Sequence, residues 1–96
     1  MKINILIVED HELTRFGLKT TFESVDFVEN IYEADSAETA IQIFNSNNVD
    51  VIIMDLGLPN MNGIEATKQI RSSNKDVKII ILTSHNDEKE VLNSLK

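Results

Sequence analysis

Acidic side chains stand directly after two of the most apolar segments of the chain. Glu9 and Asp10 follow the first segment, Asp55 follows the second, and the hydroxyl of Thr83 follows a third. Carboxylate oxygens that converge on one point hold a hard cation such as Mg²⁺. A carboxylate beside a metal-bound phosphoryl donor can act as a nucleophile and form an aspartyl phosphate. If these side chains meet in space, the sequence predicts phosphoryl-transfer chemistry.

The apolar segments themselves predict the strands that would position these residues. Short, almost continuously apolar and β-branched runs are typical of strands covered on both faces, as in parallel sheets. Three segments have this character: residues 3–8, 49–54 and 77–82. The segment 27–32 is more mixed, because it contains Glu29 and Asn30. It therefore predicts an edge strand.

The residues between the predicted strands repeat apolar positions at the spacing of an amphipathic helix. Asp35, with Glu38 three residues later, is the predicted cap of the second such segment. The stripes are Leu13, Phe16, Gly17 and Thr20; Ala37, Ala40, Ile41 and Phe44; Ile64, Thr67 and Ile70; and Val91, Leu92 and Leu95. Strands and helices therefore alternate. This order predicts a single α/β domain, an open parallel sheet with right-handed crossovers and helices on both faces.

The predicted sheet brings the acidic residues to one edge, because open α/β sheets bind ligands at the carboxyl ends of their strands. Each residue also has a purely structural interpretation: Asp10 as the cap of a helix beginning near Glu12, and Thr83 as an ordinary turn residue. Asp10 and Asp55 would crowd like charges, which costs energy unless a cation or a proton relieves it. Together the residues favour a cation site.

The composition narrows the classes of function. The 96 residues carry a net charge of −7, and the arginines, Arg15 and Arg71, belong to no basic run, which argues against direct nucleic-acid binding. There is no cysteine, so thiolate chemistry is excluded. No apolar run approaches the ~20 residues that cross a bilayer, and we expect no membrane segment and a cytoplasmic location. His11 and His85 lack a third ligand at a defined spacing, so we expect both to be solvated loop residues.

Three stretches of the chain resemble the signature stretches of response regulator receiver domains. They are Glu9-Asp10, residues 54–63 (MDLGLPNMNG) and Leu82-Thr83-Ser84. The middle stretch has the spacing Asp-x-x-x-Pro-x-x-x-Gly, at Asp55, Pro59 and Gly63. Asp10-His11, followed by Arg15, Gly17 and Leu18, further resembles the NarL/FixJ type. The resemblance runs in order from Met1 to Lys96 and identifies the CheY-like superfamily.

The resemblance implies a flavodoxin-like sheet with the strand order 2-1-3-4. Family members continue into a fifth strand and a fifth helix, so residues 1–96 are interpreted as one receiver domain with that strand and helix missing at its C-terminus. The missing strand carries a lysine that contacts the phosphoryl group. Its absence leaves the segment 77–82 as a bare edge. We expect the chain to self-associate through this fourth strand or through exchanged elements, or to need the missing piece in trans.

The resemblance also implies a role for each site residue. Asp55 would take a phosphoryl group from a phosphohistidine on a sensor histidine kinase. Mg²⁺ would be held directly by Asp10 and Asp55, by Glu9 mainly through water, and by the backbone carbonyl of Gly57. Thr83 would hold a phosphoryl oxygen and carry the signal onward. The domain would be a switch with weak self-phosphorylation and self-dephosphorylation, normally joined to a DNA-binding output domain.

Two other functions fit parts of the sequence. The first is a phosphorylation-independent interaction or dimerisation module, which the missing lysine favours and the intact Glu9, Asp10, Asp55 and Thr83 oppose. The second is a Mg²⁺-dependent phosphatase with Asp55 as nucleophile. Such enzymes usually carry a second acid two residues beyond the nucleophile, where this chain has Gly57.

Overall fold

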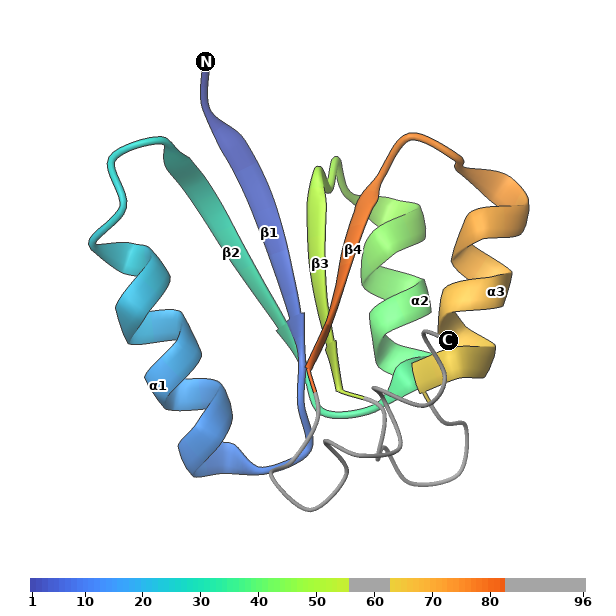
Figure 1. The fold of residues 1–96 in the computed structure, drawn as a ribbon, viewed down its shortest axis with the longest axis horizontal. Coiled ribbons are helices and arrows are strands. Elements are labelled where there is room, and N and C mark those ends of the chain that lie inside the picture. The colour runs from blue at the N-terminus through green and yellow to red at the C-terminus, as the bar shows by residue number, and fades with distance from the viewer. Residues whose placement is uncertain (56–62, 83–96) are drawn as a thin grey trace, which may run out of the picture.

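Strands and helices alternate along the chain, as the apolar spacing predicts. The computed structural model describes residues 1–55 and 63–82. The strands are β1 (Ile3–Val8), β2 (Val28–Ala34), β3 (Val51–Asp55) and β4 (Lys78–Leu82), and the helices are α1 (Glu12–Glu23), α2 (Ala37–Ser46) and α3 (Gly63–Ser73). The described strands pair in parallel in the order β2-β1-β3-β4 (Figure 1). The predicted α/β class and flavodoxin-like order are confirmed.

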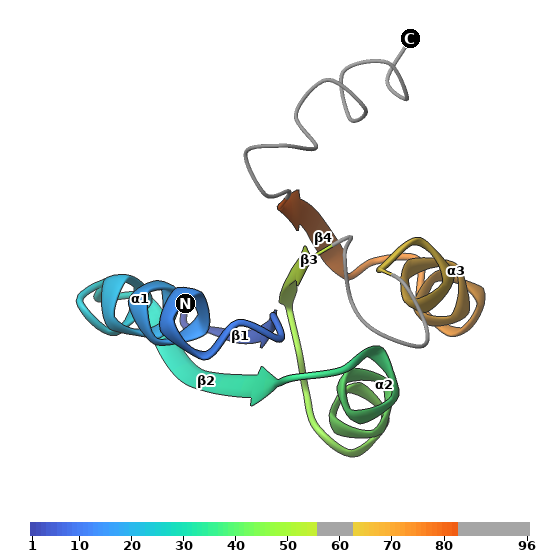
Figure 2. The same ribbon diagram turned by 90° about the horizontal axis from the view of Figure 1, so that it is seen from below.

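The helices cover both faces of the sheet. Figure 2 shows α1 on one side of the strands and α2 with α3 on the other. Consecutive side chains of β1 point to opposite faces, because strand side chains alternate. Ile5 and Ile7 pack on the α1 side, and Leu6 and Val8 pack on the α2–α3 side. The continuous apolar run of β1 therefore reflects burial on two faces at once.

The outer strands of the described sheet are β2 and β4. Glu29 and Asn30 of β2 are exposed, as predicted for an edge strand. In β4, Ile80 is 49% exposed and Ile81 is 37% exposed. Coverage on both faces, predicted for this segment from its apolar run, is thus wrong within the described residues. The strand pairs with β3 on one side, and it is the outer strand of the described sheet opposite β2.

The stripe predicted to bury α1 is wrong. Leu13 is 83% exposed and Phe16 is 64% exposed, and the other two stripe positions are exposed as well. The residues of α1 that pack against the isoleucines of β1 and β3 are Leu18 and Phe22. Both pairs have helical spacing, so spacing alone does not choose between them. The docking of α1 on the sheet makes the choice.

The burial predicted for α2 and α3 agrees more closely with the structure. In α2, Ala37, Ala40 and Phe44 are buried, which confirms the prediction. In α3, Ile70 is buried, but Ile64 is 53% exposed. The stripe predicted at residues 91–95 lies outside the described residues. None of the helices in the described ranges is long and apolar enough to cross a membrane.

The helix caps differ from those predicted. The N-cap of α2 is Ser36 and not Asp35: the Ser36 hydroxyl accepts a hydrogen bond from the Thr39 backbone N–H at 3.2 Å. The N-cap of α1 is His11, whose side chain makes no capping hydrogen bond. Asp10 is therefore not the cap of α1, and its carboxylate is not committed to the helix end.

Candidate functional site

The carboxyl ends of β1 and β3 carry three carboxylates side by side. The two strands pair in parallel, with Val8 opposite Met54. Glu9 and Asp10 follow Val8 in the chain, and Asp55 is the last residue of β3. One carboxylate oxygen from each of these three acids lies within 4.8 Å of the other two. The predicted convergence of the acidic residues is confirmed.

The carboxylates differ in their exposure to water. Glu9 is 6% exposed and Asp55 is 7% exposed, whereas the side chain of Asp10 is 29% exposed. Burying a carboxylate is costly unless it gains a partner. The Oδ1 atom of Asp10 is buried and has no hydrogen bond within the part of the chain that the structure describes. The site therefore opens to solvent beside Asp10 and leaves an acceptor oxygen there to be satisfied.

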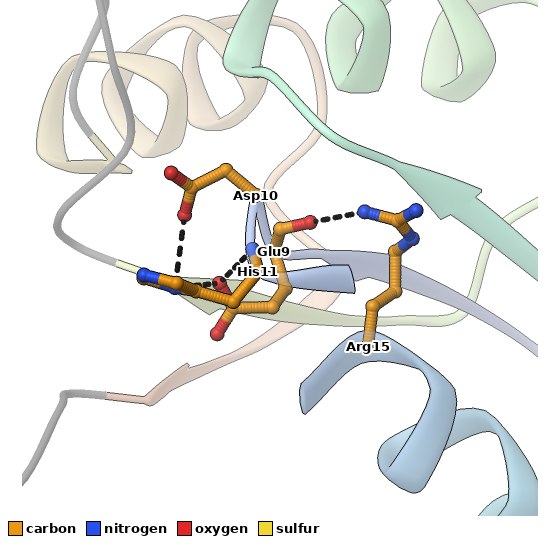
Figure 3. Close-up of polar contacts among 4 residues, drawn as sticks. All are labelled: Glu9, Asp10, His11 and Arg15. Atoms are coloured by element: carbon orange, nitrogen blue, oxygen red, sulfur yellow. Dashed lines mark hydrogen bonds and ion pairs between the residues drawn. The ribbon is translucent and has the colours of Figure 1, made fainter. Parts of the chain in front are cut away.

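His11 contacts two carboxylates of the cluster, those of Glu9 and Asp10 (Figure 3). Its backbone N–H donates to Glu9 Oε2 at 2.9 Å, and its ring Nδ1 lies 3.0 Å from the same oxygen. The ring Nδ1 is also 3.3 Å from Asp10 Oδ1, an ion-pair distance without hydrogen-bond geometry. With 70% of its side chain exposed, His11 is solvated as predicted. Its contact with Glu9 was not predicted, although the acid two residues earlier is a signal for it.

The acidic neighbours raise the pKa of His11 above its ordinary value of 6.5. The hydrogen bond to Glu9 is the largest cause, followed by the charges of Asp10 and Glu9, and Asp55 adds a smaller effect. Each of these carboxylates favours the protonated imidazole because opposite charges attract. The cluster of carboxylates therefore favours a positive charge on His11.

Arg15 holds the same loop from α1, and sequence reasoning assigned it no function. Its Nη1 donates to the backbone carbonyl of Glu9 at 2.8 Å (Figure 3). Its Nε lies 3.4 Å from Glu33 Oε1 at the end of β2, and Lys19 Nζ lies 3.4 Å from Glu33 Oε2. Two features of the sequence point to it: its position in the first turn of the helix that follows Glu9, and its part in the resemblance to the NarL/FixJ type.

Two of the predicted site residues lie outside the described residues. These are Gly57 and Thr83. Pro59 and His85 also lie there, while Gly63 is buried as the first residue of α3. The predicted roles of Gly57 and Thr83 remain predictions.

The described donors suit a hard divalent cation. Carboxylate oxygens are the ligands that Mg²⁺ and Ca²⁺ prefer, and the buried Oδ1 of Asp10 has no hydrogen bond among the described residues. Like charges within 4.8 Å repel one another unless a cation or a proton compensates. The fit of Glu9, Asp10 and Asp55 to such a cation is therefore good on both chemistry and spacing.

Comparisons with known proteins identify relatives of the chain. The family described as "Response regulator receiver domain" matches residues 5–96. Response regulator UvrY of Escherichia coli (strain K12) is 42% identical over 85 residues, which are 88% of this chain and 39% of that protein. Transcriptional regulatory protein LiaR of Bacillus subtilis (strain 168) is 42% identical over 89 residues, 93% of this chain and 42% of that protein. The chain thus spans about two fifths of the length of these curated relatives.

Solved structures share the same fold. The isolated REC domain of RcsB from Salmonella enterica serovar Typhimurium, in the presence of phosphomimetic BeF₃⁻, matches with a TM-score of 0.86 at 26% identity. That match covers 99% of this chain and 71% of the other chain. MaeR bound to beryllium trifluoride matches with a TM-score of 0.82 at 27% identity, covering 99% of this chain and 77% of that one.

Proposed function

Because the chain belongs to the family of response regulator receiver domains, we propose that Asp55 is the residue on which it is phosphorylated. The donor is a phosphohistidine on a sensor histidine kinase. A carboxylate oxygen of Asp55 attacks the phosphorus, and the phosphorus–nitrogen bond breaks with its electron pair returning to the imidazole. The product is an aspartyl phosphate at the end of β3.

The position of Asp55 carries this proposal. It ends a central strand, and Glu9 and Asp10 directly follow the neighbouring strand β1, at the sheet edge where open α/β folds bind their ligands. With 7% exposure, it lies where bulk water has little access to the acyl phosphate.

We propose Mg²⁺ as the cation of the site. Asp10 and Asp55 are the direct ligands, Glu9 acts mainly through water, and Gly57 offers its backbone carbonyl. When bound, Mg²⁺ supplies charge that stabilises the phosphoryl oxygens during transfer. Asp10 would offer its Oδ1, which is buried and has no hydrogen bond among the described residues, and His11 would keep Glu9 oriented. With positioning and charge alone, the domain assists its own phosphorylation and slow hydrolysis, as a signalling switch.

Thr83 and the wider protein complete the proposal. Thr83 would donate its hydroxyl to a phosphoryl oxygen, so that phosphorylation biases a two-state element after β4. We propose that residues 1–96 act as the receiver domain of a cytoplasmic regulator whose output domain binds DNA. The relatives named as transcriptional regulators support that output. The net charge of −7 opposes direct DNA binding by the receiver itself.

The alternative of a phosphorylation-independent interaction module is not favoured. A module that only packs against a partner gains nothing from three crowded carboxylates, which lower its stability. We propose instead that self-association occurs beside the switch function, through the exposed edge of β4. Ile80 and Ile81 are exposed on that strand, and β3 pairs with its other side.

Intact-mass spectrometry after exposure to acetyl phosphate and Mg²⁺ tests the proposed site. We expect one phosphoryl adduct on the parent chain and none on Asp55→Asn. Asp50→Asn is the matched control, because it makes the same change just before the other end of β3, and it should form the adduct. Chelating Mg²⁺ should abolish the adduct. An adduct on Asp55→Asn, or none on the parent chain, would contradict the assignment of Asp55.

A further inference from the structure

Arg15 connects the acidic loop to two neighbouring elements, and this contact has no part in the phosphoryl transfer described above. We infer that Arg15 is a positioning residue: through the Glu9 carbonyl it fixes the Glu9–Asp10 peptide in the orientation that presents both carboxylates to the cation. The inference rests on the proposed function, since it concerns the cation of that site.

The backbone of the loop is held at each side of Asp10. The Glu9 N–H donates to the Ala34 carbonyl at 3.0 Å, which continues the β1–β2 pairing. The Glu9 carbonyl accepts from Arg15 Nη1 at 2.8 Å, and the His11 carbonyl accepts from the Arg15 backbone N–H at 2.9 Å. The Asp10 residue therefore lies between two carbonyls that are both bound by Arg15, one through its side chain and one through its backbone.

The guanidinium is itself held in place. Arg15 is 20% exposed in its side chain, and its Nε faces Glu33 Oε1 at 3.4 Å. A planar guanidinium can bind two acceptors in fixed relative directions, whereas the single ammonium of a lysine cannot copy that geometry. Lys19 reaches the other oxygen of Glu33 at 3.4 Å, but no contact joins it to the Glu9 carbonyl within the described residues. Arg15 thus bridges Glu33, near the end of β2, and the Glu9 carbonyl in the loop after β1.

The sign of the effect separates positioning from simple electrostatics. A guanidinium beside a cation site repels the cation, so removing its charge should strengthen Mg²⁺ binding if charge were its whole influence. Removing a group that orients the ligands should weaken binding, and groups that support metal ligands from outside typically contribute 10- to 100-fold in affinity. The two roles therefore predict opposite changes for the same variant.

Mg²⁺ titrations followed by ¹H–¹⁵N NMR of the metal-free chain test the inference. We expect Arg15→Met to bind Mg²⁺ roughly tenfold more weakly than the parent chain. Lys19→Met is the matched control, because Lys19 also lies on α1 and contacts Glu33, and the variant removes the same charge. This variant should bind Mg²⁺ within about twofold of the parent or slightly more tightly. Arg15→Lys should recover only part of the loss, because it keeps the charge without the geometry.

Arg15→Lys provides the second arm if Arg15→Met does not fold, as judged by far-UV circular dichroism. Because Arg15→Lys keeps the positive charge, charge alone predicts no change in Mg²⁺ binding, and weaker binding reports the loss of the guanidinium geometry. If the parent binds Mg²⁺ and Arg15→Met binds it equally or more tightly, the positioning role is wrong while the proposed site stands. If the parent itself shows no Mg²⁺ binding, the proposed cation site is wrong and the inference falls with it.

Discussion

Three consecutive residues, Glu9, Asp10 and His11, differ widely in solvent exposure. Glu9 is 6% exposed, while the side chains of Asp10 and His11 are 29% and 70% exposed. Glu9 Oε2 lies 3.0 Å from the exposed imidazole of His11, and this contact is the largest cause of the raised pKa of His11. This pair gives the metal-free site a pH dependence of its own.

In the metal-free chain, we expect His11 to titrate above its ordinary pKa of 6.5. Protonated His11 gains its partner, Glu9, on folding. The resulting stability is therefore fully present below the unfolded pKa of about 6.5 and is lost as the pH rises through the higher folded pKa. His11→Gln should thus lower the urea midpoint at about pH 5.5 and leave it nearly unchanged at about pH 9.

Two observations check that interpretation of His11. An NMR titration of its ring protons should give a pKa above the ordinary value, and Glu9→Gln should bring that pKa down, since the hydrogen bond to Glu9 is the largest cause of the shift. A loss of stability in His11→Gln that is the same at both pH values would show that the ring acts through packing and not through its charge.

At the level of elements, the N-caps of α1 and α2 determine whether the neighbouring polar side chains bind the helix end or stay free for other contacts. At α2, Ser36 supplies the cap, and Asp35 is left exposed. At α1, His11 occupies the cap position without a capping bond from its side chain, which leaves Asp10 to the acidic cluster. From the first turn of α1, the Arg15 side chain donates a hydrogen bond to the Glu9 carbonyl, and the Arg15 backbone N–H donates to the His11 carbonyl. This helix therefore supports the loop that carries Asp10.

The cap of α2 gives a direct test at this level. We expect Ser36→Ala to lower the free energy of unfolding by roughly 1 kcal/mol, because the Thr39 N–H loses its hydrogen-bond acceptor. Asp35→Ala, the change at the residue predicted from sequence, should cost less than about 0.5 kcal/mol, since it removes only a charge near the helix start. Urea denaturation of both variants measures the difference. A larger loss for Asp35→Ala would assign the cap to that residue instead.

Across the whole molecule, the two outer strands differ in how they meet solvent. The exposed positions of β2 include Glu29 and Asn30, and charged or polar side chains protect an edge from pairing with another chain. β4 exposes Ile80 and Ile81 instead. An apolar edge of this kind is a template for pairing with a second copy.

We expect the chain to self-associate through β4 and expect Ile80→Lys to prevent it. A lysine on the edge disfavours strand pairing, and the fold should tolerate it because Ile80 is 49% exposed. Ile64→Lys is the matched control: Ile64 is 53% exposed but lies in α3, away from the edge. Sedimentation over a range of concentrations should show association for the parent and for Ile64→Lys, and a monomer for Ile80→Lys. A parent chain that stays monomeric at high concentration would refute this proposal.

The sequence by itself determined the alternation of strands and helices and the acidic strand ends, because both are local patterns. The strands β1 and β3 are buried on two faces, which leaves apolar runs in the segments 3–8 and 49–54 that the sequence alone identifies. The convergence of Glu9, Asp10 and Asp55 then follows from parallel pairing, since the carboxyl ends of such strands share an edge.

Only the tertiary structure decided which of several equivalent local choices is used. In α1, Leu13 with Phe16 and Leu18 with Phe22 have helical spacing alike, and docking on β1 and β3 buries the second pair. The contact of Arg15 with the Glu9 carbonyl joins a helix side chain to a strand end, and the Arg15–Glu33 pair spans two elements distant in sequence. Such contacts depend on how the elements pack against one another, which periodicity does not encode.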